Sequence, residues 1–294
     1  MSRISTLISV KLLAEKIASN QSNVRVLDCS WHLPSSKRVA RNEYLQQHIP
    51  GALFFDIDEC CSHETDLPHM LPSAKQFEDY VGNLGINNNT HVIVYDTNEN
   101  FGIFSAQRCW WNFRVFGHSA ISILDGGLCQ WSKEGHSLTS EIPKVERQIF
   151  KAIFNPSLVW RFEDVEKNIQ TKHHQLVDAR ASGRFHGTAP EPRADTKPGH
   201  IPGSLNIPFH NVMNKTTKTW KSPEELRKMF ADFEVDLEKP VTFSCGSGVT
   251  ACTLAVAANL CGKDDVQIYD GSWTEWFRRA NPEQMEDVPD EIPE

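Results

Sequence analysis

The sequence lacks several features that define large classes of protein. No apolar run approaches the ~20 residues that a membrane-spanning helix needs, so we expect no membrane partner. Positive charge is not in excess: 30 Lys and Arg stand against 38 Asp and Glu, a formal net charge of −8. This balance argues against nucleic acid as the main partner. The N-terminal stretch has too short an apolar run for a signal peptide, and Glu15 with a single arginine makes it a poor transit peptide.

What is present is typical of an ordinary globular protein. The chain has 294 residues, of which 39% are hydrophobic and 23% charged, enough for two domains. Its eight cysteines, without a secretory signal, are expected to be reduced thiols and not a disulfide framework. We therefore expect a protein of the cytoplasm, with mitochondria as a second compartment.

The histidines and cysteines do not have the spacing of a metal site. Cys60 and Cys61 are adjacent and are followed by His63, which does not match the usual gaps between zinc ligands. No second cysteine pair follows, so no metal is expected. Tryptophan is plentiful, but Trp131 and Trp276 recur at matching places in the two halves, which favours core packing over a cofactor site. We expect no cofactor.

The chain repeats itself at a spacing of about 150 residues, too long for a solenoid and typical of a duplicated domain. The matching segments are 26–29 with 176–179, 48–52 with 200–204, 92–96 with 241–245, and 123–127 with 268–272. The copies differ where the second has Cys245 and a Gly-rich turn, because the first has Asp96 followed by Thr-Asn-Glu-Asn. Only one half therefore keeps a candidate nucleophile.

Each half alternates short β-rich runs with helical segments, which predicts an α/β fold with a parallel sheet covered on both faces. Strands are predicted at 24–28, 92–96, 121–125, 175–179, 241–245 and 266–270, and helices at 77–84, 106–116, 224–233 and 251–260, besides one capped by Ser9. We predict a non-catalytic domain at 1–140, a linker at 141–159, a catalytic domain at 160–285 and an acidic tail at 286–294. The chain from Pro282 onward is expected to be poorly ordered.

The stretch 241–260 is the most informative part of the sequence. A β-branched run ends at Cys245, a turn containing Gly246 and Gly248 follows, and an Ala-rich helix begins after Thr250. This order places a thiol before the N–H groups of a helix N-terminus, which favour a thiolate. The two glycines allow several amides to form an anion-binding nest. We therefore predict a nucleophilic cysteine.

A cysteine phosphatase would need an arginine at the end of this loop to clamp the phosphoryl oxygens. The residue after Thr250 is Ala251, so the clamp is missing and a phosphatase is excluded. A loop of neutral amides with Ser247 and Thr250 suits a smaller anion, such as a second sulfur atom carried on the thiolate of Cys245.

The sequence closely resembles the two-domain sulfurtransferases of the rhodanese superfamily, and within it the branch that uses 3-mercaptopyruvate. The resemblance covers about the whole chain from Leu12 to Pro282 and rests on the segments 245–251, 200–203, 270–276, 183–185 and 191–193. The loop is the specific part, because thiosulfate-preferring members usually have charged residues where this chain has Gly246 and Ser247. The resemblance implies tandem rhodanese-like domains, each a parallel sheet of about five strands flanked by helices.

The resemblance also implies roles for particular residues. Cys245 would take sulfur from 3-mercaptopyruvate and release pyruvate, within a loop that also includes Gly246, Gly248, Val249 and Thr250. Arg184 and Arg193, on a turn-rich loop, would hold the carboxylate and keto oxygens, which suit planar guanidinium groups. Arg180 is expected to be structural, paired with Asp178 or a loop carboxylate.

A proton-transfer group is implied by the same resemblance. Ser247 would be joined by His69 and Asp58 from the first half, a Ser–His–Asp arrangement that eases C–S cleavage. Alternation places Asp56 and Asp58 on the same side of an extended segment, so the residues alone do not choose between them, whereas the family comparison favours Asp58.

The persulfide would pass its outer sulfur to thioredoxin, a small thiol or cyanide, with hydrogen sulfide as a potential product. Two alternatives stay open. One is a thiosulfate:cyanide sulfurtransferase that uses the same cysteine, and the other is a persulfide carrier in a sulfur relay.

Overall fold

The computed structural model describes residues 4–291, which form two compact units. Unit 1 contains the described residues up to His63, together with Leu71–Asn155 and Met213–Trp220. Unit 2 contains Glu64–Met70, Pro156–Val212 and the described residues from Lys221 onward. Two short segments therefore group with the other unit and not with their neighbours in the sequence. Glu64–Met70 belongs to unit 2, and Met213–Trp220 belongs to unit 1.

Unit 1 is built on a five-stranded sheet in the order β1-β5-β4-β2-β3, in which every pairing is parallel. The strands are β1 (Leu7–Ile8), β2 (Val24–Asp28), β3 (Ala52–Phe54), β4 (His91–Tyr95) and β5 (Ile121–Leu124). The helices are α1 (Val10–Ala18), α2 (Ala40–Gln46), α3 (Ala74–Asn83), α4 (Ala106–Val115) and α5 (Gly127–Lys133), with a 3₁₀ turn η1 (Pro34–Ser36).

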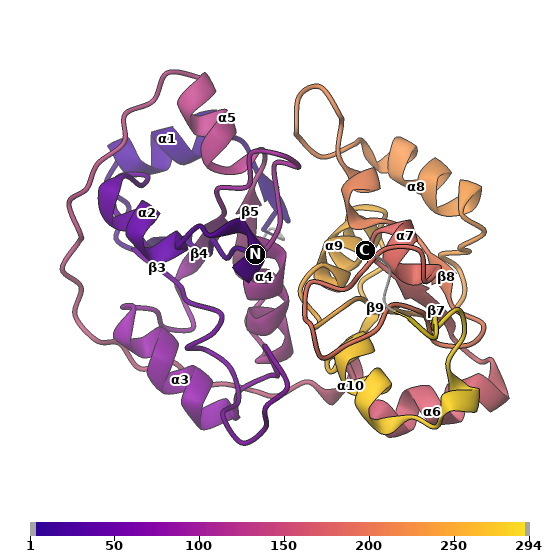
Figure 1. The fold of residues 1–294 in the computed structure, drawn as a ribbon. Helices are drawn as coiled ribbons and strands as arrows, with labels where there is room; N and C mark the ends of the chain where they lie inside the picture. Colours follow the sequence, from indigo (N-terminus) through magenta and orange to yellow (C-terminus); the bar gives the residue numbers. More distant parts are fainter. Residues whose placement is uncertain (1–3, 292–294) are drawn as a thin grey trace. The chain divides into compact units, whose positions relative to one another are not determined.

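Apolar residues lie on both faces of this sheet, which explains why helices cover both faces. On one face, Leu13 of α1 and Trp131 of α5 share a buried cluster with Val26 of β2, the strand next to the central β4. On the other face, the rings of Phe77 in α3 and Phe113 in α4 meet edge to face with centroids 5.1 Å apart. Figure 1 shows α1 and α5 on one side of the strands and α3 on the other.

Unit 2 repeats the same plan, with the parallel order β6-β10-β9-β7-β8. Its strands are β6 (Val159–Trp160), β7 (Gln175–Asp178), β8 (Leu205–Asn206), β9 (Val241–Ser244) and β10 (Gln267–Tyr269). Its helices are α6 (Phe162–Thr171), α7 (Ser182–Phe185), α8 (Pro223–Asp232), α9 (Ala251–Leu260) and α10 (Ser272–Arg279), with 3₁₀ turns η2 (Pro156–Leu158), η3 (Phe209–Val212) and η4 (Pro282–Gln284). Corresponding strands occupy corresponding places, so the predicted tandem α/β fold is confirmed.

The six predicted strands are present as β2, β4, β5, β7, β9 and β10, each within two residues of its expected bounds. The four that the sequence did not reveal, β1, β3, β6 and β8, are the edge strands, two or three residues long. The predicted cap is also present, because the Ser9 side chain accepts a hydrogen bond from the Leu12 N–H at 3.3 Å.

The predicted packing role of the repeated tryptophans is confirmed. Trp131 and Trp276 are buried in the cores of their units. The expectation of a poorly ordered tail is wrong for the described residues, because the segment after Pro282 packs on unit 2. Met285 and Val288 lie against the core there, and the Trp276 indole N–H donates to the Gln284 carbonyl at 2.9 Å.

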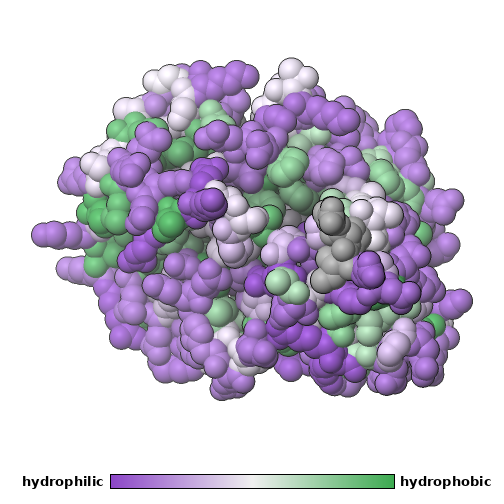
Figure 2. All heavy atoms as spheres, in the orientation of Figure 1, coloured by the Kyte–Doolittle hydropathy of each residue, from purple (hydrophilic) through white to green (hydrophobic). Residues whose placement is uncertain are grey.

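Within residues 4–291, no helix combines the length and the apolar character needed to cross a bilayer. The face of the molecule in Figure 2 is mainly hydrophilic, with smaller hydrophobic areas between the polar side chains. All eight cysteines are free thiols.

Candidate active site

Cys245 lies at the carboxyl end of the central strand β9. The strand ends at Ser244, Cys245 follows directly, and α9 begins at Ala251, so residues 245–250 form the turn between them. Gly248 has φ +74°, in the left-handed region where a side chain would be strained. The structure thus has the strand, turn and helix that the sequence predicted around this thiol.

The turn presents backbone donors that nothing else in residues 4–291 uses. Amide N–H groups without a protein acceptor belong to Gly246, Ser247, Val249, Thr250 and Ala251. Unpaired amides before a helix N-terminus form a site of positive partial charge. Such a site favours an anion on or beside the Cys245 sulfur.

The backbone on the other side of the turn is held by α10. The Trp273 N–H donates to the Cys245 carbonyl at 2.9 Å, and the Thr274 hydroxyl donates to the Gly246 carbonyl at 2.7 Å. The Cys245 N–H donates to Ser272 Oγ at 3.2 Å. These contacts fix the thiol-bearing residue, and only the recurrence of the 270–276 segment could have pointed to them in the sequence.

Unit 1 shows what happens to the equivalent donors when the cysteine is replaced. Asp96 follows β4 as Cys245 follows β9. Its Oδ2 accepts the N–H groups of Phe104, Ser105 and Ala106 at 2.8, 2.9 and 3.0 Å, at the start of α4. A carboxylate of the chain itself therefore occupies the anion position in unit 1, whereas the corresponding amides of unit 2 stay open.

The thiol is well shielded. Cys245 is 1% exposed, while its neighbours Gly246 and Ser247 are half-buried. Val249 and Cys252 are buried on the side toward α9, and Cys252 Sγ donates to the Gly248 carbonyl at 3.2 Å. A sulfur atom held on Cys245 would be largely protected from water.

Arg184 lies beside the loop. It belongs to the short helix α7, so the prediction that it lies on an irregular loop is wrong. Its backbone N–H donates a hydrogen bond to the Ala181 carbonyl at 3.0 Å. Its guanidinium forms a bidentate ion pair with Glu191. Nε donates to Oε1 at 3.0 Å, and Nη2 donates to Oε2. The side chain is 23% exposed, whereas Glu191 is 4% exposed. Glu191 thus orients the Arg184 guanidinium.

Glu191 also contacts Arg180, which is entirely buried. Arg180 Nη1 lies 2.8 Å from Glu191 Oε1, and Nη2 lies 2.7 Å from Asp178 Oδ2. Burial on its own lowers the pKa of Arg180, but the charges of Asp178 and Glu191 outweigh it and raise that pKa above its usual value. The predicted structural pairing of Arg180 is confirmed. The sequence analysis missed the role of Glu191, because no spacing in the sequence marks a carboxylate that bridges two arginines.

Gly246 and Arg184 occupy adjoining space. A Cβ added to Gly246 would lie 2.9 Å from Arg184 Nη2, closer than side chains pack. Since the backbone of Gly246 is not in the left-handed region, a side chain here would strain no backbone, but it would displace the end of the Arg184 side chain. The neutral residue after the cysteine is therefore linked to the position of the arginine.

Arg193 lies on the segment between α7 and β8 and is half-buried. Its carbonyl accepts the Thr196 N–H at 3.2 Å, which fixes the local turn.

The structure brings together Ser247 and His69. Ser247 Oγ lies 3.1 Å from His69 Nδ1, and His69 is 3% exposed with φ +63°, an unusual conformation for a residue with a side chain. His69 belongs to Glu64–Met70, the segment that packs with unit 2. Asp58 is an exposed residue of unit 1, where its Oδ2 accepts the Trp31 indole N–H at 2.8 Å.

Among the described residues, no group of three or more His, Cys, Asp or Glu side chains is arranged to hold a metal ion. Cys60 and Cys61 are buried, and burial raises the pKa of Cys60 well above its ordinary value.

Comparison with known proteins agrees with this geometry. A model of the rhodanese-like domain matches residues 9–134 and 162–279. The chain is 54% identical over 280 residues to a thiosulfate sulfurtransferase of Rattus norvegicus, covering 94% of this chain and 93% of the relative. It is 47% identical over 281 residues to a 3-mercaptopyruvate sulfurtransferase of Homo sapiens, covering 95% and 94%.

Solved structures give the same result. The fold is similar to that of Tum1 from Saccharomyces cerevisiae, with a TM-score of 0.85 at 33% identity over 98% of this chain and 100% of that one. It is also similar to SseA from Escherichia coli, a 3-mercaptopyruvate sulfotransferase structure, with a TM-score of 0.82 at 36% identity over 92% and 99%. The chain therefore belongs to the rhodanese family, as one of its two-domain sulfurtransferases.

Proposed function

We propose that this sulfurtransferase takes sulfur from 3-mercaptopyruvate through a persulfide on Cys245 and releases pyruvate. The observation that carries the proposal is the ring of unpaired amides around a shielded thiol, in a loop without a cationic side chain. Dipoles of this kind stabilise a singly charged persulfide without a guanidinium or ammonium group.

The neighbourhood of the loop supports an α-keto acid as the donor. Arg184 has donors left after its ion pair with Glu191, because a guanidinium carries five N–H bonds and the pair uses two. Those donors would hold the carboxylate, and Arg193 would supply the second guanidinium for the keto oxygen. Gly246 leaves the space that this position of Arg184 needs.

The reaction then has two halves, as in other covalent catalysis. The Cys245 thiolate attacks the sulfur of 3-mercaptopyruvate, an S–S bond forms, and the C–S bond breaks to leave the enolate of pyruvate. A proton must reach the enolate carbon. Ser247, hydrogen-bonded to His69, is the proposed route, and Asp58 is proposed as the group that orients His69.

The persulfide is then discharged by an acceptor. A thiol of thioredoxin or of a small molecule attacks the outer sulfur and regenerates the Cys245 thiolate, and cyanide can do the same. A second thiol then displaces hydrogen sulfide from the acceptor persulfide. Eight free cysteines suit a reducing compartment, so we propose the cytoplasm, with mitochondria as a second site.

Thiosulfate is the second candidate donor. It is favoured by the 54% identity to a thiosulfate sulfurtransferase, compared with 47% to a 3-mercaptopyruvate sulfurtransferase. The neutral Gly246 and Ser247 argue the other way, because a dianion would gain more from a cationic loop. A persulfide carrier is the third candidate, and it would load Cys245 without releasing pyruvate.

Steady-state rates with the two donors decide between these candidates. We expect kcat/KM for 3-mercaptopyruvate to exceed that for thiosulfate by at least about 10-fold, a difference of about 1.4 kcal/mol in transition-state binding. A higher kcat/KM for thiosulfate would make the chain a thiosulfate sulfurtransferase instead. Sulfur loading without pyruvate would make it a carrier.

A further inference from the structure

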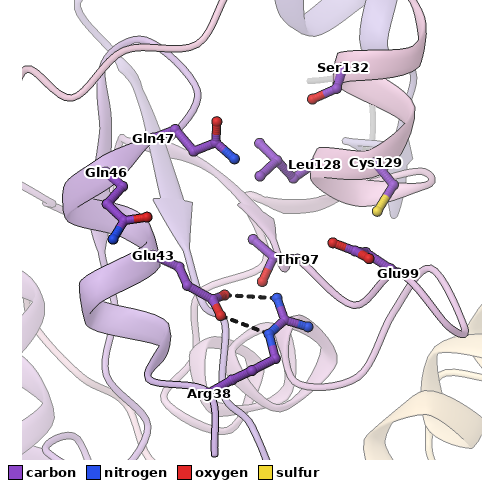
Figure 3. Close-up of a pocket in the computed structure, with 9 residues that line it drawn as sticks. All are labelled: Arg38, Glu43, Gln46, Gln47, Thr97, Glu99, Leu128, Cys129 and Ser132. Carbon is purple, nitrogen blue, oxygen red and sulfur yellow. Dashed lines mark hydrogen bonds and ion pairs between the residues drawn. The ribbon is translucent and has the colours of Figure 1, made fainter.

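Unit 1 contains a cavity of about 600 Å³ at the carboxyl end of its sheet, a volume suited to a small molecule. It lies beyond β4 and between α2 and α5, the place that the catalytic turn occupies in unit 2. Figure 3 shows the side chains that line it: Arg38, Glu43, Gln46, Gln47, Thr97, Glu99, Leu128, Cys129 and Ser132.

The charges in this cavity leave one carboxylate uncompensated. Arg38 donates to both carboxylate oxygens of Glu43, at 2.7 and 2.8 Å, and His32 Nε2 lies 3.0 Å from the same carboxylate. That pair neutralises itself. Glu99 is exposed and forms no ion pair with a residue of 4–291; the charge of Arg38 acts on it, but Arg38 is already paired with Glu43, so the cavity favours a ligand with a positively charged group.

A buried hydroxyl marks the cavity as a place for a polar ligand. Thr97 is 8% exposed, lines the cavity, and its Oγ1 has no hydrogen-bond partner in the described chain. A buried hydroxyl without a partner is costly, and a ligand donor or acceptor would remove that cost once the side chains that cover this oxygen shift. The side-chain amides of Gln46 and Gln47 offer further hydrogen bonds at the rim.

The cavity also contains a thiol. Cys129 is half-buried, and the only other cysteine that is not buried is Cys261. Burial raises the pKa of Cys129, and the negative charges of Glu99 and Asp96 raise it further, while Arg38 opposes them. Figure 3 shows the Glu99 carboxylate close to the Cys129 sulfur. A cation bound to Glu99 would therefore favour the thiolate of Cys129.

We propose that this cavity is a binding site for small amine-bearing disulfides, held by Glu99 and Thr97, and that Cys129 exchanges with them. The Cys129 thiolate attacks one sulfur of the disulfide, an S–S bond forms between them, and the original S–S bond breaks. The other half leaves as a thiolate and takes up a proton. Cys129 is oxidised and one half of the disulfide is reduced, so no further oxidant is needed. This chemistry is independent of Cys245.

Cys261 is a built-in control for the charge argument. It is also partly exposed, and burial raises its pKa, but its charged neighbour is Arg227, whose guanidinium donates to the Cys261 carbonyl at 3.0 Å. If charge directs the exchange, Cys129 should prefer a cationic disulfide and Cys261 an anionic one.

The test treats the reduced full-length protein with cystamine or with dithiodiglycolate and follows each cysteine by peptide mass spectrometry. We expect cystamine to modify Cys129 at least about 10-fold faster than dithiodiglycolate, with the opposite preference at Cys261. Glu99→Gln should remove the preference at Cys129, and Thr97→Val should slow its reaction with cystamine several-fold. The same pattern is expected in Cys245→Ser.

The proposal is overturned if Cys129 forms no adduct, if it reacts with both disulfides at the same rate, or if the preference survives in Glu99→Gln. It is also overturned if Thr97→Val reacts as fast as the wild type, since the cavity would then contribute no binding.

Discussion

At the scale of single residues, Glu191 connects Arg184, beside the Cys245 loop, with the buried Arg180. It orients Arg184 with two contacts and shares an oxygen with the fully buried Arg180. Glu191→Gln keeps the shape but removes the charge and one acceptor of the pair. We expect KM for 3-mercaptopyruvate to rise about 10-fold, with a much smaller change in kcat, because substrate placement and not the thiol is affected.

Steady-state kinetics and thermal unfolding of Glu191→Gln check this prediction, with the exposed Glu238→Gln as the matched control. A fall in kcat with KM unchanged would show that Glu191 does not act through substrate binding. A loss of activity that only follows a loss of folded protein would assign it a structural role.

Gly246 gives a second prediction at this scale. Ala at this position would place its Cβ 2.9 Å from Arg184 Nη2, so the guanidinium must move while the backbone stays where it is. Gly246→Ala should raise KM for the donor several-fold and leave persulfide formation at saturating donor nearly intact. A double-mutant cycle tests the link, because Gly246→Ala should have little further effect in Arg184→Ala. Full additivity of the two changes would contradict it.

At the scale of elements, the central strands could be predicted and the edges could not. β4 and β9 are rich in β-branched and aromatic residues, are buried almost throughout, and are followed by a polar or reactive residue, a pattern typical of buried parallel strands. β6 and β8 are two residues long, and such strands depend on pairing with a neighbour that the sequence does not specify. The position of Arg184 on α7 was missed because one helical turn has no periodicity to detect.

The N-terminus of α4 shows the stabilising value of Asp96, the residue that unit 1 has where unit 2 has Cys245. Asp96 accepts three N–H groups there, at 2.8 to 3.0 Å, and is buried. Asp96→Ala should lower the free energy of unfolding by about 2 kcal/mol, since charged acceptors at a helix start contribute that much. Urea unfolding measures the loss. Asp79→Ala on α3, whose carboxylate forms ion pairs at the surface with Lys75 and Arg147, is the control, and an equal loss in both variants would refute the assignment.

The start of β4 predicts a dependence on pH. Burial lowers the pKa of His91 to about 4, and its Nε2 lies 2.9 Å from Ser122 Oγ on β5. The unfolded chain protonates this ring at its ordinary pKa of about 6.5. Between those values the folded state binds fewer protons, so the free energy of unfolding falls as the pH falls from about 6.5 to about 4.

Urea unfolding at pH 7.5 and pH 5 tests this prediction. His91→Gln, which cannot be protonated, should lose less stability than the wild type over this interval. The comparison between the two proteins is needed because burial raises the pKa of Asp28 to about 6, which gives an effect of the opposite sign. His63→Gln, at an exposed position, is the control. If the free energy of unfolding changes by the same amount between the two pH values in His91→Gln as in the wild type, His91 is ruled out as the source.

At the scale of the whole molecule, the duplication explains both the fold and the placement of the site. The repeated segments predicted two copies of one topology, and both sheets have the same strand order. The divergence at Asp96 and Cys245 predicted which copy keeps the nucleophile. The sequence could not show that the N–H groups after the central strand are hydrogen-bonded to Asp96 in unit 1 and lack an acceptor in the described part of unit 2. This depends on where the backbone of each turn lies. Nor could it show that the segment of His69 packs with unit 2.

The central claim is that Cys245 carries sulfur, and mass spectrometry of the protein mixed with 3-mercaptopyruvate and no acceptor tests it most directly. The account predicts a gain of one sulfur atom, located on the peptide of Cys245, with an equal amount of pyruvate released. Cys245→Ser should show neither, although it unfolds like the wild type. Pyruvate release at the wild-type rate by Cys245→Ser, or a sulfur atom on another residue in its place, would contradict the account.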